Sequence, residues 1–104
     1  MGFDQYHEPA DELPQETRTF ARMIIGLIEE AEAIDWYEQR MAVEPDEDAR
    51  AIMANAQMEE FKHFCMDLEW LFRKKPTWQK IGRMVLFQDG DIVELAEAAE
   101  EAVE

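Results

Sequence analysis

Apolar residues recur at steps of three and four along two long stretches of the chain, the pattern of amphipathic helices. The first stretch extends from about Pro14 to Met41, and the second from about Glu47 to Lys75, where Pro76 stops it. Between them, Pro45 disfavours helix at the residue before it, and Asp46 is suited to cap the second helix. A short turn between two long helices predicts an antiparallel hairpin.

The remaining segments are shorter. Residues 1–13 are polar and contain Pro9, which predicts an irregular arm. After Pro76 we expect a short helix from about Trp78 to Phe87, a turn at residues 89–91, and a final acidic helix over residues 92–103. The sequence therefore predicts one all-α domain over residues 1–104, with the arm at 1–13, the hairpin at 14–75 and a C-terminal helical segment at 76–104.

The second long helix is apolar on more than one side. One stripe along it is mixed, with polar residues in its middle: Ile52, Ala56, Glu60, His63, Asp67 and Trp70. A second surface carries Met58, Phe61, Cys65, Leu68 and Phe72. A helix with two such surfaces needs neighbours on more than one side, and a single hairpin cannot provide them. We therefore expect the chain to be half of a four-helix bundle that dimerisation completes.

Composition supports this expectation and excludes some partners. The chain has 104 residues, 47% of them hydrophobic, with seven Met, six Phe and three Trp, so part of this apolar surface is expected to pack against another copy. The chain has 25 acidic and 10 basic residues. This excess of negative charge argues against nucleic acid as a partner and favours the binding of cations. The single cysteine, the lack of a long apolar run and the absence of a signal-peptide pattern predict a cytoplasmic protein without a membrane span.

The candidate chemistry lies at Glu60 and His63, which are three residues apart and leave one face of the second helix. On the first helix, Glu30 turns toward the apolar face, Glu29 points the opposite way and Glu32 lies between. A buried, unpaired carboxylate is costly. Glu30 is therefore either a boundary residue that reaches water or an arginine, or a ligand.

Two hairpins related by a two-fold axis would bring together four carboxylates and two imidazoles, from Glu30, Glu60 and His63 of each chain. Such a set suits a carboxylate-bridged pair of iron or manganese ions better than a structural zinc. In this arrangement Glu60 bridges the metals, and Glu30 and His63 are terminal ligands. Because each chain alone holds half of the site, metal should promote dimerisation.

Three segments resemble the encapsulated ferritins, the half-length ferritin-like proteins that are packaged inside encapsulin shells. The segments are residues 29–40, with the sequence EEAEAIDWYEQR, residues 59–63, with EEFKH, and residues 68–71, with LEWL. The resemblance extends from about His7 to the last helix. Two positions depart from the family: Asn55 stands where relatives can carry histidine, and residues 100–104 do not match the usual shell-targeting tail.

The resemblance implies a ferritin-like half-bundle that pairs into ferroxidase dimers, which assemble as an open decameric ring. It implies oxidation of Fe(II) by dioxygen at a di-iron site, with the mineral stored by an encapsulin nanocompartment in the cytoplasm. By position, Glu30, Glu60 and His63 are the iron ligands, and Trp36 and Tyr37 lie close to them. Glu29 and Glu32, which point away from the core, match a secondary or entry site; Ca, Mn or Zn are further candidate cations.

Two alternatives remain open from the residues themselves. The ligand set does not separate iron from manganese, so a different di-metal oxidase or peroxidase could use the same half-bundle. A non-catalytic helical interaction module is the other alternative, and it predicts that Glu60→Ala leaves metal content and assembly unchanged.

Overall fold

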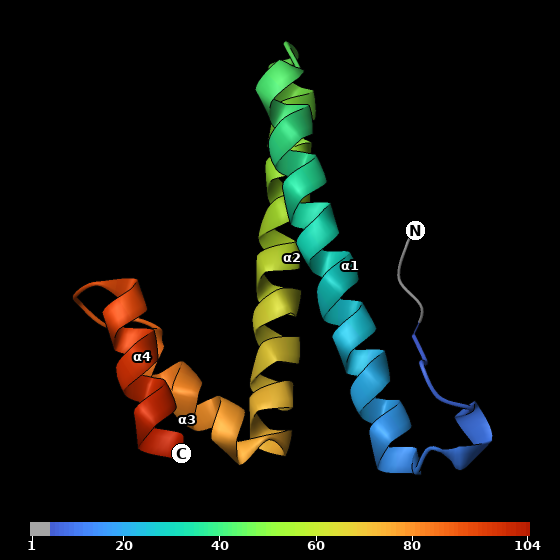
Figure 1. The fold of residues 1–104 in the computed structure, drawn as a ribbon. Coiled ribbons are helices and arrows are strands. Elements are labelled where there is room, and N and C mark those ends of the chain that lie inside the picture. The colour runs from blue at the N-terminus through green and yellow to red at the C-terminus, as the bar shows by residue number, and fades with distance from the viewer. Residues whose placement is uncertain (1–4) are drawn as a thin grey trace. The chain divides into compact units, whose positions relative to one another are not determined.

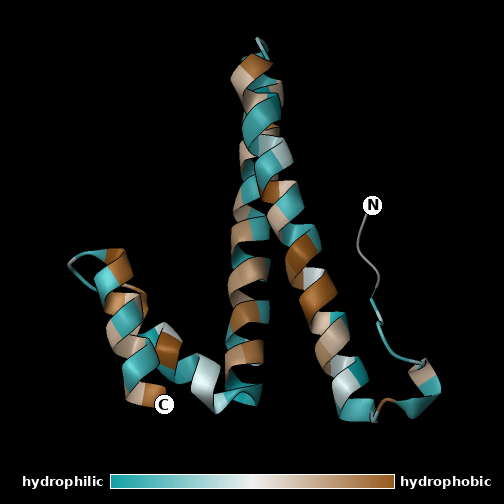
Figure 2. Cartoon of the chain, viewed as in Figure 1, coloured by the Kyte–Doolittle hydropathy of each residue, from teal (hydrophilic) through white to brown (hydrophobic). Residues whose placement is uncertain are grey.

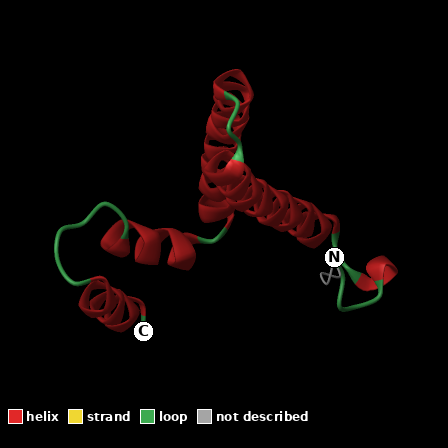
Figure 3. Ribbon diagram, turned by 90° about the horizontal axis from the view of Figure 1, so that it is seen from above, coloured by secondary structure: helices red, strands yellow, loops and turns green. Residues whose placement is uncertain are grey.

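The computed structural model describes residues 5–104, all of which lie in helices or in the loops that join them (Figures 1 and 3). A 3-10 turn, η1 (Ala10–Glu12), precedes two long helices, α1 (Gln15–Val43) and α2 (Glu47–Lys74). Two shorter helices follow, α3 (Pro76–Val85) and α4 (Ile92–Val103). The all-α class and the hairpin are therefore confirmed. The first four residues of the predicted irregular arm lie outside the described part of the chain.

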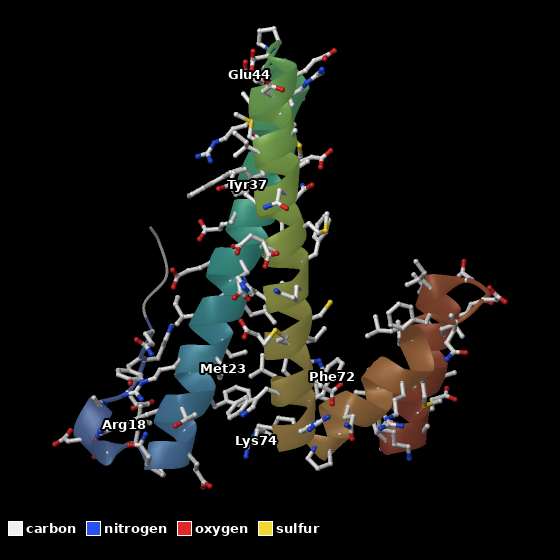
Figure 4. All side chains as sticks on the ribbon, turned by 180° about the vertical axis from the view of Figure 1, so that it is seen from behind. Arg18, Met23, Tyr37, Glu44, Phe72 and Lys74 are labelled. Atoms are coloured by element: carbon white, nitrogen blue, oxygen red, sulfur yellow. The ribbon has the colours of Figure 1, made fainter. Side chains whose placement is uncertain are left out.

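The hairpin turn has the capping chemistry that the sequence predicts. The Asp46 carboxylate accepts a hydrogen bond of 2.8 Å from the backbone N–H of Ala49, so it caps the first turn of α2. The Glu44 carboxylate accepts a second bond, of 2.9 Å, from the backbone N–H of Asp46. Figure 4 shows Glu44 at the tip of the hairpin. These local bonds reverse the chain between two helices that would otherwise continue.

The chain divides into two compact units, residues 1–68 and residues 69–104. In the second unit, the edge of one ring of Phe72 and Trp78 meets the face of the other, with centroids 5.2 Å apart. Helices α3 and α4 pack against each other, and Asp91 caps α4 by accepting from the N–H of Glu94 at 3.0 Å. The predicted final helix and its cap are confirmed.

Helix α3 occupies a different range from the predicted residues 78–87. It begins at Pro76, because proline is well accommodated in the first turn of a helix. It ends at Val85, because Leu86 is extended and Phe87 has a positive φ of 60°. The predicted helix therefore begins two residues after the observed one and also ends two residues after it.

The hairpin part of the first unit has no enclosed apolar core. Among the described residues, the only fully buried apolar side chains are Leu71 and Ala99, both in the second unit. Figure 2 shows hydrophobic residues in bands along α1 and α2. Ile52, Met58 and Phe61 on α2 are 72%, 61% and 49% exposed. The apolar surface of the long helices is thus largely unused within one chain.

The arm before α1 is attached by Arg18, whose guanidinium donates a hydrogen bond to the carbonyl of Ala10. Figure 4 shows Arg18 near the start of the hairpin. Within the described residues, no helix has the length and apolar character needed to cross a membrane.

Candidate metal centre

Glu60 and His63 form a pair on α2. Nδ1 of His63 lies 3.0 Å from Oε1 of Glu60, which is the contact expected of residues one helical turn apart. When Nδ1 carries the proton, Nε2 is left with a lone pair for a metal or an acid. The imidazole is exposed, whereas Glu60 is half-buried. The pair therefore presents one carboxylate and one imidazole on the same face of α2.

Glu30 faces α2 from the opposite side of the hairpin. Its side chain is half-buried, and its Oε1 atom is shielded from water without any hydrogen-bond partner in the structure. Burial, followed by a hydrogen bond to Asp67 and the negative charges of Asp67, Glu60 and Glu29, raises the pKa of Glu30 from 4.5 to about 8. The ionised carboxylate is thus disfavoured here unless a positive charge comes close.

Asp67 was placed on the mixed stripe of α2 in the sequence but was given no role there. It lies one turn beyond His63 and is half-buried. Its Oδ2 atom lies so close to α1 that a Cβ atom added to Gly26 would be 3.2 Å away. The signal that could have identified it was the i, i+4 spacing of His63 and Asp67, together with a glycine one turn before Glu30.

The three predicted ligands do not form a complete site within one chain. Glu60 and His63 touch, and Glu60 is near enough to raise the pKa of Glu30. Yet, over residues 5–104, no group of three or more His, Cys, Asp or Glu side chains is arranged to hold a metal ion. The oxygen-rich donor set and the unpartnered Oε1 atom of Glu30 are suited to a hard cation. These residues fit a centre that a second set of ligands would have to complete.

The other predicted site residues are on α1. Glu29 is exposed, whereas Glu32 is half-buried rather than pointing fully away. The guanidinium carbon of Arg40 lies 5.3 Å from the centre of the Tyr37 ring, and Figure 4 shows Tyr37 between Met23 and the hairpin tip. Trp36 is 49% exposed and lines a shallow depression with Gln39 and Arg40. The structure brings none of these four into contact with the Glu60–His63 pair.

Gln57 connects the two helices beside the site. It is the one buried polar side chain of the described residues, 8% exposed. Its Nε2 donates to the carbonyl of Ile34 at 3.1 Å and to Oε1 of Glu38 at 2.9 Å. Since Gln57 lies one turn before Glu60 and Ile34 one turn after Glu30, these bonds hold the two acids at a common level of the hairpin.

Glu59, next to Glu60, is in a different environment. It is exposed and forms an ion pair of 2.9 Å with Lys62, which lowers the pKa of Glu59 through a hydrogen bond and opposite charge. Neighbouring glutamates on one helix therefore have different surroundings. The charge of Glu59 is paired with Lys62 at the surface, whereas Glu60 faces other acids.

Comparison with known proteins gives the family. A family model described as EncFtn-like matches residues 5–89, which is most of the chain. The chain belongs to the EncFtn-like family.

Relatives and a solved structure agree with this assignment. The chain is 45% identical to a ferritin-like protein of Thermotoga maritima over 90% of its own length and 82% of the relative's. It is 42% identical to an encapsulated ferritin-like protein of Rhodospirillum rubrum, over 94% of this chain and 69% of that protein. The crystal structure of protein ne0167 from Nitrosomonas europaea superposes with a TM-score of 0.83 at 43% identity, over 86% of this chain and 98% of that one.

The predicted resemblance to the encapsulated ferritins is thereby confirmed, and so is the ferritin-like helical fold. Membership of the EncFtn-like family supports a ferritin-like role connected with iron. The roles of Glu30, Glu60 and His63 as ligands stay predictions.

Proposed function

We propose that two copies of this chain form a ferroxidase, which oxidises Fe(II) to Fe(III) with dioxygen at a site shared across a two-fold axis. The observation that carries the proposal is the part-buried carboxyl group of Glu30, whose Oε1 has no partner, close to Glu60 and its contact His63. Two such half-sites supply four carboxylates and two imidazoles, the ligand set of a di-iron carboxylate centre.

The exposed apolar surfaces of the hairpin support the dimer. Apolar residues such as Ile52 and Phe61 stand exposed on α2, and within residues 5–68 no apolar side chain is fully buried in one chain. Packing against a second hairpin would remove this surface from water at about 25 cal/mol per Å². The same packing would shield the acids from water, which strengthens their attraction for a cation.

The chain's own residues have distinct tasks in this proposal. Glu60, Glu30 and His63 would hold the iron, Glu60 as the carboxylate shared by the two ions and Glu30 and His63 as a ligand of one ion each. The Nδ1 contact of His63 with Glu60 orients the ring so that Nε2 is free to bind. Glu29 and Glu32 would attract Fe(II) toward the centre, and Trp36 and Tyr37 would lie beside it. Fe(II) is the substrate, and dioxygen accepts its electrons.

The family name of the Rhodospirillum rubrum relative supports a location for this activity. We propose that the dimers assemble as a decameric ring inside an encapsulin nanocompartment in the cytoplasm, and that the shell stores the oxidised iron. Other divalent cations, such as Mn, Zn or Ca, would compete for the same oxygen ligands.

Native mass spectrometry of the full chain during anaerobic titration with Fe(II) tests the shared site. We expect two irons for each dimer and none on monomers, and a rise in Fe(III) absorbance when air is admitted. Glu60→Ala should abolish both results, whereas the matched control Glu59→Ala changes the neighbouring exposed glutamate and should keep them. Iron bound to monomers at scattered stoichiometry, or equal loss in both variants, would overturn the proposal.

A further inference from the structure

The carboxylate of Asp67 lies close to α1 at a glycine. Its Oδ2 atom approaches the backbone of α1 at Gly26, where an added Cβ atom would be 3.2 Å from that oxygen. This separation is tighter than an ordinary van der Waals contact, so a side chain at position 26 would shift the carboxylate by a few tenths of an ångström. The pairing of Gly26 with Asp67 thus brings an acidic group across the hairpin into the interior between α1 and α2.

The neighbour of Asp67 on α1 is Glu30, one turn beyond Gly26. The carboxyl groups of Asp67 and Glu30 are within hydrogen-bonding reach of each other, and each repels the other when both are ionised. Among the described residues, no lysine or arginine forms an ion pair with either group. The lysine and arginine ion pairs on α2 are exposed ones, between Glu59 and Lys62 and between Glu69 and Arg73. The chain itself therefore supplies no cation to this pair of acids.

A structural role alone gives a poor account of this arrangement. Two acids in contact repel each other once both are ionised, whereas Asn or Thr at position 67 would occupy similar volume without the charge. The buried Oε1 atom of Glu30 is also left unpartnered although Asp67 is its neighbour. Both features are accounted for when a metal ion lies close to the two carboxylates.

We propose that Asp67 is a further metal-contacting residue of the centre, which binds iron from the turn of α2 that follows His63. The inference rests on the proposed function, because it requires that Glu30 hold a metal. It changes the charge of the site: each half then supplies three carboxylates and one imidazole. Two halves carry six negative charges, which balance two Fe(III) ions, whereas four carboxylates balance two Fe(II) ions.

The charge count makes Asp67 a determinant of the preference of the site for trivalent over divalent ions. Removing one carboxylate from each half should weaken the binding of a trivalent ion more than that of a divalent ion, since Coulomb energy scales with the product of charges. Mn(II) and Tb(III) serve as redox-stable probes of the two charge states, and both prefer oxygen ligands. Binding can therefore be measured without any iron oxidation.

Isothermal titration of the metal-free full chain with Mn(II) and with Tb(III) tests the inference. Asp67→Asn should weaken Mn(II) binding about tenfold and Tb(III) binding about a hundredfold. Asp35→Asn makes the same chemical change at an exposed position of α1 and should leave both affinities unchanged.

A second variant separates metal binding from folding. Gly26→Ala should raise helix propensity, yet it shifts the Asp67 carboxylate and should reduce Tb(III) affinity. A chain that is no less stable but binds Tb(III) more weakly supports a ligand role, because loss of folding could not explain it. Unchanged affinity in Gly26→Ala and in Asp67→Asn would overturn the inference.

Glu30→Ala distinguishes this inference from the function on which it rests. If Glu30→Ala abolishes binding while Asp67→Asn behaves like Asp35→Asn, the shared centre stands and the role of Asp67 is refuted. If Glu30→Ala also leaves binding unchanged, the proposed centre itself fails.

Discussion

The raised pKa of Glu30 predicts that the metal-free protein loses stability as the pH rises. Below about pH 4.5 the carboxyl group is protonated in both the folded and the unfolded chain, and it has no effect. Between pH 4.5 and about 8, the unfolded chain releases this proton and the folded chain retains it. The folded state then binds more protons than the unfolded state, so the free energy of unfolding falls across this range.

The pKa also sets the size of the effect. One pKa unit corresponds to about 1.4 kcal/mol, so a rise from 4.5 to about 8 gives a ceiling of about 5 kcal/mol. Water reaches part of the half-buried side chain and screens its repulsion, so we expect a loss of about 1–2 kcal/mol. Glu30→Gln keeps the shape of the protonated acid and should abolish the loss. The free energy of unfolding of the variant should equal that of the wild type near pH 4.5 and exceed it above pH 8.

Urea unfolding of both proteins, followed by far-UV circular dichroism with a chelator and at fixed protein concentration, measures this difference. Glu59→Gln is the matched control. Lys62 lowers the pKa of Glu59, so this acid stabilises the fold above its ordinary pKa and the contribution is lost as the pH falls. The difference in free energy of unfolding between wild type and variant should therefore change with pH in opposite directions for Glu30→Gln and Glu59→Gln. A difference between wild type and Glu30→Gln that stays constant from about pH 5 to about pH 9 would refute the reasoning.

Two further predictions concern packing. Gln57→Ala removes the hydrogen bonds to Ile34 and Glu38, and should lower the free energy of unfolding by about 1–3 kcal/mol in urea titrations. Exposed Gln39→Ala should have no such effect, and equal stability of the two variants would contradict the role of Gln57. Gly82→Ala would place a Cβ atom 2.8 Å from Cζ of Phe72, so we expect faster amide hydrogen exchange in α3 and α4. Slower exchange would mean that the gain in helix propensity outweighs the clash.

Much of the fold follows from local signals. The three- and four-residue spacing of apolar residues predicted both long helices, and the caps at Asp46 and Asp91 formed as expected. Such signals can be read from the sequence because a helix and its cap depend on residues a few positions apart. The start of α3 at Pro76 was missed, because the same proline was interpreted only as the end of α2.

For the site, the sequence by itself determined which acids share a helical face, since that depends only on spacing. It predicted the contact of Glu60 with His63 and the inward direction of Glu30. Only the tertiary structure decided that Asp67 lies against Glu30 and that Gly26 makes room for it. These contacts join helices whose residues are some forty positions apart, and the relative height of two helices in a hairpin is set by tertiary packing, including the hydrogen bonds of Gln57.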